Sequence, residues 1–131
     1  MAHGQPIANH FSNLKRAYAN LEKVLNMPYD EIVRDSIIKR FELVFELLWK
    51  LIKKLAAEEN LECYSPKSCF KIAYQMKLIE DEEIFLDMLE CRNLTVHTYD
   101  EYDAERVYQF VRDKGIFAFK KVIQKIEEKI K

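Results

Sequence analysis

The sequence predicts an all-α fold, an antiparallel up-and-down helical bundle with four long helices and one short helix. Only 2 Gly and 3 Pro occur among its 131 residues, whereas a β-sandwich or barrel needs turn residues about every 8–12 positions. Apolar residues recur at spacings of three and four over most of the chain. The length favours a single domain over residues 1–131, with residues 1–6 as a loose leader.

The first two predicted helices are the longest uninterrupted patterns. The first runs from about Ile7 to Asn26 and ends before Pro28. The second starts at Asp30 as N-cap and continues to about Asn60 without Gly or Pro. Its apolar face is wider than packing on one side requires, which fits burial in mid-bundle, a dimer interface, or both. This face comprises Ile37, Phe41, Val44, Phe45, Leu48, Ile52 and Leu55, flanked by Leu43, Leu47, Leu51 and Trp49.

The remaining helices are predicted mainly from their start signals. Ser65 followed by Pro66 begins a short third helix that reaches about Met76. The fourth begins near Asp81, where acidic residues interact favourably with the positive end of the helix dipole. The fifth follows residues 98–103, where Asp100 or Asp103 is the cap, and runs toward the C-terminus. Gly115 either kinks or divides this helix, and the sequence leaves both open.

Composition narrows the classes of function. Lys+Arg total 21 and Asp+Glu 22, so a nucleic-acid role must use a local patch. No apolar run approaches the roughly 20 residues of a membrane span, and the N-terminus does not resemble a signal peptide. Cys63, Cys69 and Cys91 are odd in number and form no Cys-x-x-Cys pair, so we expect buried or half-buried free thiols. These observations predict a cytoplasmic protein with no membrane partner, no metal site and no cofactor.

The segment from Arg92 to Tyr99 collects residue types that carry chemistry. On a continuous helix Arg92 and His97 would lie about 140° apart, whereas Asn93 and His97 would share a face. Arg92 and His97 therefore work together only if the helix ends near His97 or if a second subunit completes a groove. The ordinary alternative is a surface ion pair for Arg92 and a helix-dipole role for His97.

This motif resembles that of a known superfamily. Arg92-Asn93-x-x-x-His97-x-Tyr99 is similar to the Arg-polar-x-x-x-His core of the HEPN superfamily, and its x-Tyr ending to HepT-type toxins. These toxins are paired with minimal nucleotidyltransferase (MNT) antitoxins. Residues 39–50 resemble the long-helix signature of the branch called nucleotidyltransferase substrate-binding proteins, and residues 65–67 and 87–100 resemble its later blocks.

The resemblance implies a homodimer whose two motifs face each other across a cleft, and metal-independent RNA cleavage by the ribose 2′-hydroxyl. His97 would then act as general base or acid. Arg92 would hold the phosphate and stabilise transition-state charge, and Asn93 would orient the phosphate or His97. The HepT–MNT pairing further implies that Tyr99 accepts AMP from the nucleotidyltransferase, which would block the cleft.

Two other interpretations remain open at this stage. The chain is alternatively a non-catalytic substrate-binding subunit of a minimal nucleotidyltransferase, or a purely structural dimeric bundle. A structural role gives no reason for Arg92, Asn93, His97 and Tyr99 to occur at this spacing. The expected partners are a second copy of the chain, a minimal nucleotidyltransferase and, if the protein cleaves it, RNA.

Overall fold

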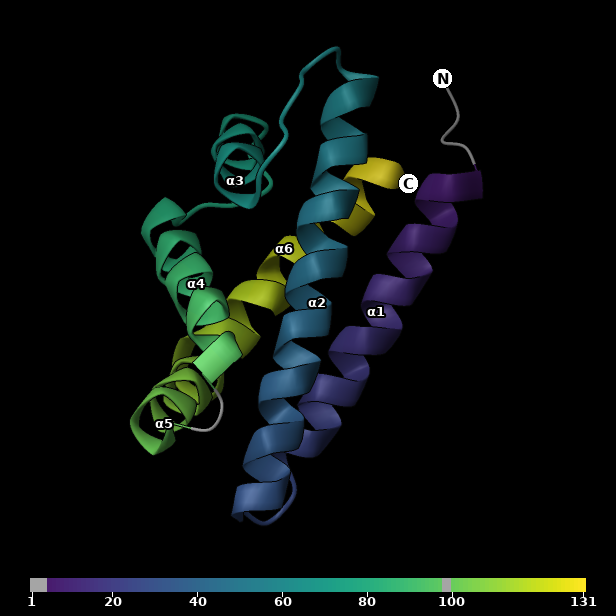
Figure 1. Ribbon diagram of the computed structural model, residues 1–131. Coiled ribbons are helices and arrows are strands. Elements are labelled where there is room, and N and C mark those ends of the chain that lie inside the picture. The colour runs from purple at the N-terminus through teal and green to yellow at the C-terminus, as the bar shows by residue number, and fades with distance from the viewer. Residues whose placement is uncertain (1–4, 98–99) are drawn as a thin grey trace.

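The computed structural model describes residues 5–97 and 100–131 and shows helices throughout, with no strand in these ranges (Figure 1). The all-α prediction is confirmed. Within the described ranges, no helix is long and apolar enough to cross a membrane. The elements are α1 (Gln5–Leu25), α2 (Glu31–Glu58), α3 (Pro66–Gln75), α4 (Glu82–Leu94), the 3₁₀ turn η1 (Thr95–His97), α5 (Glu101–Phe110), the π-helical turn η2 (Val111–Gly115) and α6 (Ile116–Ile130).

Helix α2 is the centre of the bundle. It forms an antiparallel hairpin with α1 and contacts α3, α4 and α5 (Figure 1). All seven residues of its predicted core face are buried, as is Leu51. Leu47 and Trp49 are only partly buried, and Leu43 stays 49% exposed. Burial in the middle of the bundle therefore explains most of the wide apolar face. It does not account for Leu43 and Leu47, whose exposed surface could contact another molecule.

Local capping fixes where the helices start. The Asp30 carboxylate accepts a hydrogen bond from the Val33 N–H at 2.7 Å. Ser65 and Ser68 cap α3 reciprocally, and Asp81 caps α4. At the start of α5 the cap is Asp100, which leaves the Asp103 carboxylate for another partner. The starts of α2, α3 and α4 are predictable from residue type alone, because a cap is a contact over three residues. At α5 the sequence left Asp100 and Asp103 both open.

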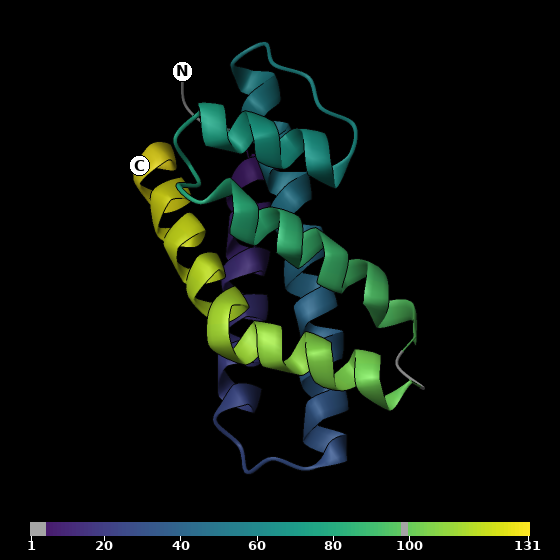
Figure 2. The same cartoon turned by 90° about the vertical axis from the view of Figure 1, so that its left-hand side faces the viewer.

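The last helix bends without breaking at Gly115. Backbone angles stay helical from Phe110 to Ile116, but Val111–Gly115 widens into a π-helical turn. Figure 2 shows that α5 and α6 run in different directions on either side of it, as expected at a π-bulge. A Cβ atom at Gly115 would lie 3.0 Å from the Phe110 ring. A side chain at this position would therefore require the Phe110 ring to move by a few tenths of an ångström.

The cysteine prediction is wrong for two of the three residues. Cys63 and Cys69 form a disulfide with a Cα–Cα distance of 5.1 Å. Their spacing gave no hint of it, because the link depends on the α2–α3 connection folding back over α3. Cys91 is free and buried, and its burial raises its pKa to about 11, so it is not a reactive thiolate. The cysteine-based argument for a cytoplasmic location therefore no longer holds.

We expect reduction of the Cys63–Cys69 disulfide to destabilise the fold by about 2 kcal/mol, the loop-closure value for a short ring. Thermal unfolding with and without a thiol reductant measures the change. A variant with serine at both positions should unfold like the reduced wild type and should not respond to reductant. An unchanged midpoint on complete reduction would contradict a stabilising role.

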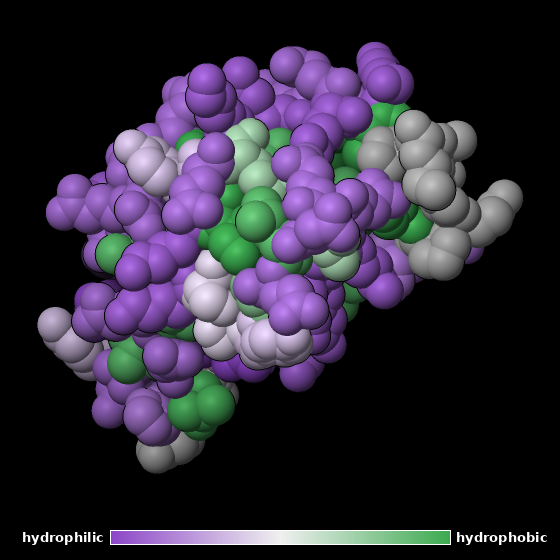
Figure 3. Space-filling model, turned by 90° about the horizontal axis from the view of Figure 1, so that it is seen from above, coloured by the Kyte–Doolittle hydropathy of each residue, from purple (hydrophilic) through white to green (hydrophobic). Residues whose placement is uncertain are grey.

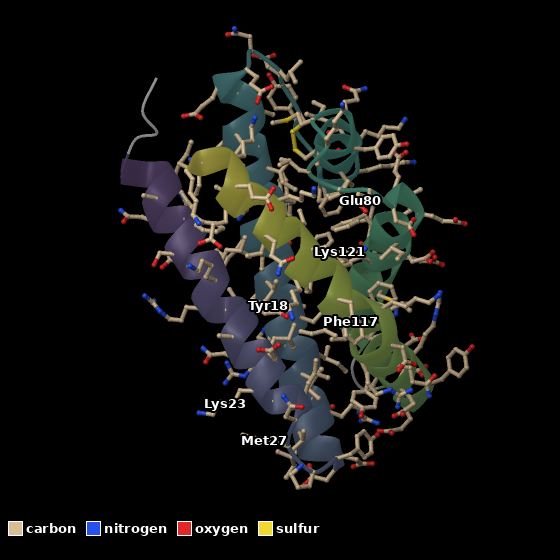
Figure 4. The ribbon with its side chains drawn as sticks, turned by 180° about the vertical axis from the view of Figure 1, so that it is seen from behind. Tyr18, Lys23, Met27, Glu80, Phe117 and Lys121 are labelled. Carbon is tan, nitrogen blue, oxygen red and sulfur yellow. A yellow bond between two sulfur atoms is a disulfide. The ribbon has the colours of Figure 1, made fainter. Side chains whose placement is uncertain are left out.

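The end of the molecule near α3 has a mixed surface. Seen from this side, apolar side chains appear mainly in the middle and are surrounded by polar ones (Figure 3). On the opposite side from the view of Figure 1, a groove of about 810 Å³ lies between α6 and the start of α4. Phe117 and the Lys121–Glu80 ion pair line it (Figure 4). The groove contains none of the predicted site residues.

Candidate functional site

The predicted motif lies where α4 ends. Arg92 and Asn93 belong to its last turn, and the chain then tightens into the 3₁₀ turn that ends at His97. The Thr95 hydroxyl caps this turn by donating to the Arg92 carbonyl at 2.7 Å. The condition that the helix end near His97 is therefore met. Tyr99 lies outside the described residues.

Arg92 is held against α2. Its Nη2 lies 3.3 Å from Glu46 Oε1, and its Nη1 donates to Thr95 Oγ1 at 3.3 Å. The side chain is only 25% exposed, and its buried Nε has no hydrogen-bond partner. This guanidinium is thus oriented by two contacts and keeps spare donors, which is a suitable state for binding a phosphate.

His97 is paired with a residue that the sequence analysis assigned only to capping. Its Nδ1 lies 3.3 Å from Asp103 Oδ2, and the two side chains are 48% and 19% exposed. A carboxylate at Nδ1 fixes the ring orientation and places the neutral proton on that nitrogen, so Nε2 becomes the proton-exchanging atom. Asn93 is exposed beside these residues. The only sequence feature that could have indicated this pairing was the position of an aspartate, Asp103, six residues after His97.

A second ion pair anchors the far side of the motif. Arg34 of α2 is only 3% exposed and makes a bidentate contact with Glu101 at the start of α5, at 2.7 and 3.1 Å. Glu105 lies 3.7 Å from the same guanidinium. Sequence reasoning missed Arg34, although a charged residue three positions before Ile37 on the core face was a usable signal. Arg34–Glu101 and Glu46–Arg92 thus attach both ends of segment 92–101 to one helix.

The Arg34–Glu101 pair should make the free energy of unfolding fall as the solution becomes acidic. Hydrogen bonding from Arg34 lowers the pKa of Glu101 below its usual 4.5. The contribution of this ion pair to folding stability is therefore present above pH 4.5. It is lost as the pH falls through the lowered pKa of Glu101 in the folded state. We expect the stability difference between wild type and Glu101→Gln to shrink on acidification from about pH 6 to about pH 3, as measured by urea unfolding. A difference that stays constant with pH would contradict this.

No metal centre is evident in the part of the chain that the structure describes. There, no three His, Cys, Asp or Glu side chains are grouped so that they hold a metal ion. The side chains described at the site are a guanidinium, an imidazole and an amide, with the carboxylates of Glu46 and Asp103 beside the first two.

The helical bundle, with Arg92, Asn93 and His97 at the end of one helix, is the arrangement that the sequence resemblance predicts. The family model for nucleotidyltransferase substrate binding protein like proteins matches residues 9–128, and the chain belongs to this family.

Several known proteins are similar to it. The probable ribonuclease HepT of Haemophilus influenzae is 31% identical over 91 residues, which are 63% of this chain and 62% of that protein. The match thus spans less than two thirds of the curated relative. A Thermus thermophilus protein of known crystal structure is 29% identical, with a TM-score of 0.74 over 90% of this chain and 98% of its own.

The third comparison shows the fold alone. The tri-AMPylated HEPN toxin of Shewanella oneidensis, solved in complex with its MNT antitoxin, has a TM-score of 0.77 at 20% identity. The alignment covers 96% of this chain and 99% of that one. The helical arrangement is therefore common to this chain and to a toxin that carries AMP.

Proposed function

We propose that the protein is a metal-independent endoribonuclease of the HepT type, controlled by a minimal nucleotidyltransferase that transfers AMP to Tyr99. The observation that carries the proposal is the pairing of the two key side chains with carboxylates: Arg92 with Glu46, and His97 with Asp103. An ordinary surface arginine and histidine would not each need an orienting partner at the same helix end.

The chemistry follows from these residue types. A neutral His97 takes the proton of a ribose 2′-hydroxyl through Nε2, and the 2′-oxygen attacks the adjacent phosphorus. Arg92 holds the phosphate while negative charge grows on it. The P–O5′ bond breaks, and a protonated histidine gives its proton to the leaving 5′-oxygen. The products are a 2′,3′-cyclic phosphate and a 5′-hydroxyl end.

One subunit supplies only one such histidine, so the reaction requires a second copy. The apolar side chains near the site support this. Leu43 of α2 is 49% exposed and Val96, next to His97, is 65% exposed. Burying both against a partner would remove apolar surface from water and bring the second His97 to the cleft.

We expect a homodimer at micromolar concentration, through α2 and the motif, burying well over about 1,000 Å² in total as stable dimers do. Sedimentation velocity measures the state. Val96→Glu should give a monomer, because it places a charge in the interface. Phe117→Glu, at a 61% exposed aromatic of α6, is the matched control and should stay dimeric. A wild-type monomer under these conditions would refute the dimer.

An RNA-cleavage assay with the purified dimer tests the function. We expect cleavage in the presence of EDTA, with cyclic phosphate at the new 3′ ends. Absence of cleavage across several RNA substrates would favour the alternative, a non-catalytic substrate-binding subunit of the nucleotidyltransferase.

A further inference from the structure

Residues 39–50 of α2 include side chains that hydrogen-bond or form ion pairs on one side of the helix, and burial in the bundle does not explain them. Glu46, Trp49 and Lys50 lie on one side of α2, and Glu46 faces the last turn of α4. The sequence pattern of this segment predicts burial and a family resemblance, and neither requires a contact with Arg92. Its contact with Arg92 joins two regions that are 46 residues apart in the chain.

We propose that Glu46, supported by the indole of Trp49, is the positioning residue of Arg92 and fixes the plane of the guanidinium for its phosphate. This rests on the proposed function for the identity of the phosphate. We call the contacts of Glu46 with Arg92 and Trp49 the brace. The geometry of the brace does not depend on the proposed function.

The carboxylate of Glu46 is held at both oxygens. Oε1 lies 3.3 Å from Arg92 Nη2, while Oε2 accepts the Trp49 Nε1–H at 3.1 Å. Lys50 Nζ is 3.9 Å from the same Oε2. Trp49 is half-buried and packs against the core, so its N–H has little freedom. The carboxylate is therefore presented to Arg92 in one orientation.

Counting donors shows what the brace leaves for a ligand. An arginine has five N–H donors. Glu46 engages Nη2, Thr95 engages Nη1, and the Nε–H is buried. Each terminal nitrogen carries two N–H groups and has one of these partners, so one N–H on each terminal nitrogen is left over from these contacts and can donate to a phosphate.

The position of the pair argues against a purely stabilising role. Arg92 and Glu46 keep 25% and 34% of their side-chain surface exposed and neither belongs to the hydrophobic core, so the loss of one partner leaves the other within reach of water. A long arginine side chain without its brace would instead sample several rotamers. The brace should consequently affect turnover more than unfolding.

The experiment compares four variants in the full-length protein: Glu46→Ala, Glu46→Gln, Trp49→Phe and Glu42→Ala. Glu42 lies one turn earlier on α2 and is not among the residues that hydrogen-bond to Arg92 or pair with it, so it is the matched control. We expect Glu46→Ala to lower kcat about 100-fold through misplacement of Arg92, with little change in melting temperature. Glu46→Gln should recover part of the rate, since its amide oxygen still accepts from Nη2, whereas its NH₂ group cannot accept from the Trp49 indole. Trp49→Phe should give an intermediate loss.

A readout independent of catalysis separates this proposal from the proposed function. In an NMR spectrum, the buried Arg92 Nε–H should exchange slowly with water in wild type, Glu46→Gln and Glu42→Ala, and fast in Glu46→Ala; Arg92→Lys assigns the signal. A slow Arg92 Nε–H in Glu46→Ala overturns the positioning role, whatever the activity. An equal loss of kcat in Glu42→Ala overturns it as well. If the wild type cleaves no RNA but exchange of the Arg92 Nε–H still depends on Glu46, the ribonuclease proposal is refuted and the positioning role of Glu46 is supported.

Discussion

His97→Ala and Arg92→Ala should each abolish RNA cleavage and leave the bundle folded. Loss of His97 removes proton transfer, typically worth about 10²–10⁴-fold in rate. Loss of Arg92 removes stabilisation of the pentacoordinate phosphorus, about 3–4 kcal/mol by analogy with an oxyanion donor. Cleavage of a defined oligoribonucleotide measures both.

Melting temperatures should move little in either variant. His97 is about half exposed and Arg92 about a quarter, and neither belongs to the hydrophobic core. Arg92→Lys should fail as well, because an ammonium keeps the charge but not the two-pronged geometry. Cleavage that survives His97→Ala would point to contamination or to another site. Inhibition by EDTA would show that a metal takes part.

Asp103 extends the same argument to the orientation of His97. Asp103→Asn should lower the rate, because the amide no longer fixes the ring and its Nδ1–H tautomer as the carboxylate does. His97→Ala combined with Asp103→Asn should be no worse than His97→Ala alone, since Asp103 acts through the ring. An additive loss would mean that Asp103 has a separate role.

Predictions that depended on local physics were the ones confirmed. Asp30, Ser65 and Asp81 each cap a helix through a contact three residues away, so residue type sufficed. The core face of α2 was equally predictable, because helical periodicity places its members on one side. The all-α class and the family resemblance followed from such patterns.

The contacts that organise the site were not predictable in this way. Arg34 meets Glu101 across 67 residues and Arg92 meets Glu46 across 46, so each depends on how helices pack, not on spacing. The Cys63–Cys69 disulfide depends likewise on the path of a connection. Joint action of Arg92 and His97 was predicted under the condition that the helix end near His97 or that a second subunit complete a groove, and α4 and η1 meet the first of these conditions.

Modification of Tyr99 should switch the ribonuclease off. Incubation with the cognate nucleotidyltransferase and ATP should add the mass of AMP as the phenolic oxygen attacks the α-phosphate and pyrophosphate leaves. Tyr99 follows His97 by two residues in the sequence. The hydrogen bond from the Asp100 N–H to the His97 carbonyl, at 2.8 Å, keeps the flanking residues together.

The added group carries a negative phosphodiester and an adenosine, which would occupy the phosphate site of Arg92 and exclude RNA by charge and by bulk. Tyr99→Phe should cleave RNA, gain no mass and resist neutralisation. Tyr102→Phe, at a 77% exposed tyrosine on α5, is the matched control and should still be modified and silenced. A mass gain that persists in Tyr99→Phe and disappears in Tyr102→Phe would move the acceptor to α5. Full activity of a stoichiometrically modified protein would separate AMP transfer from the control of cleavage.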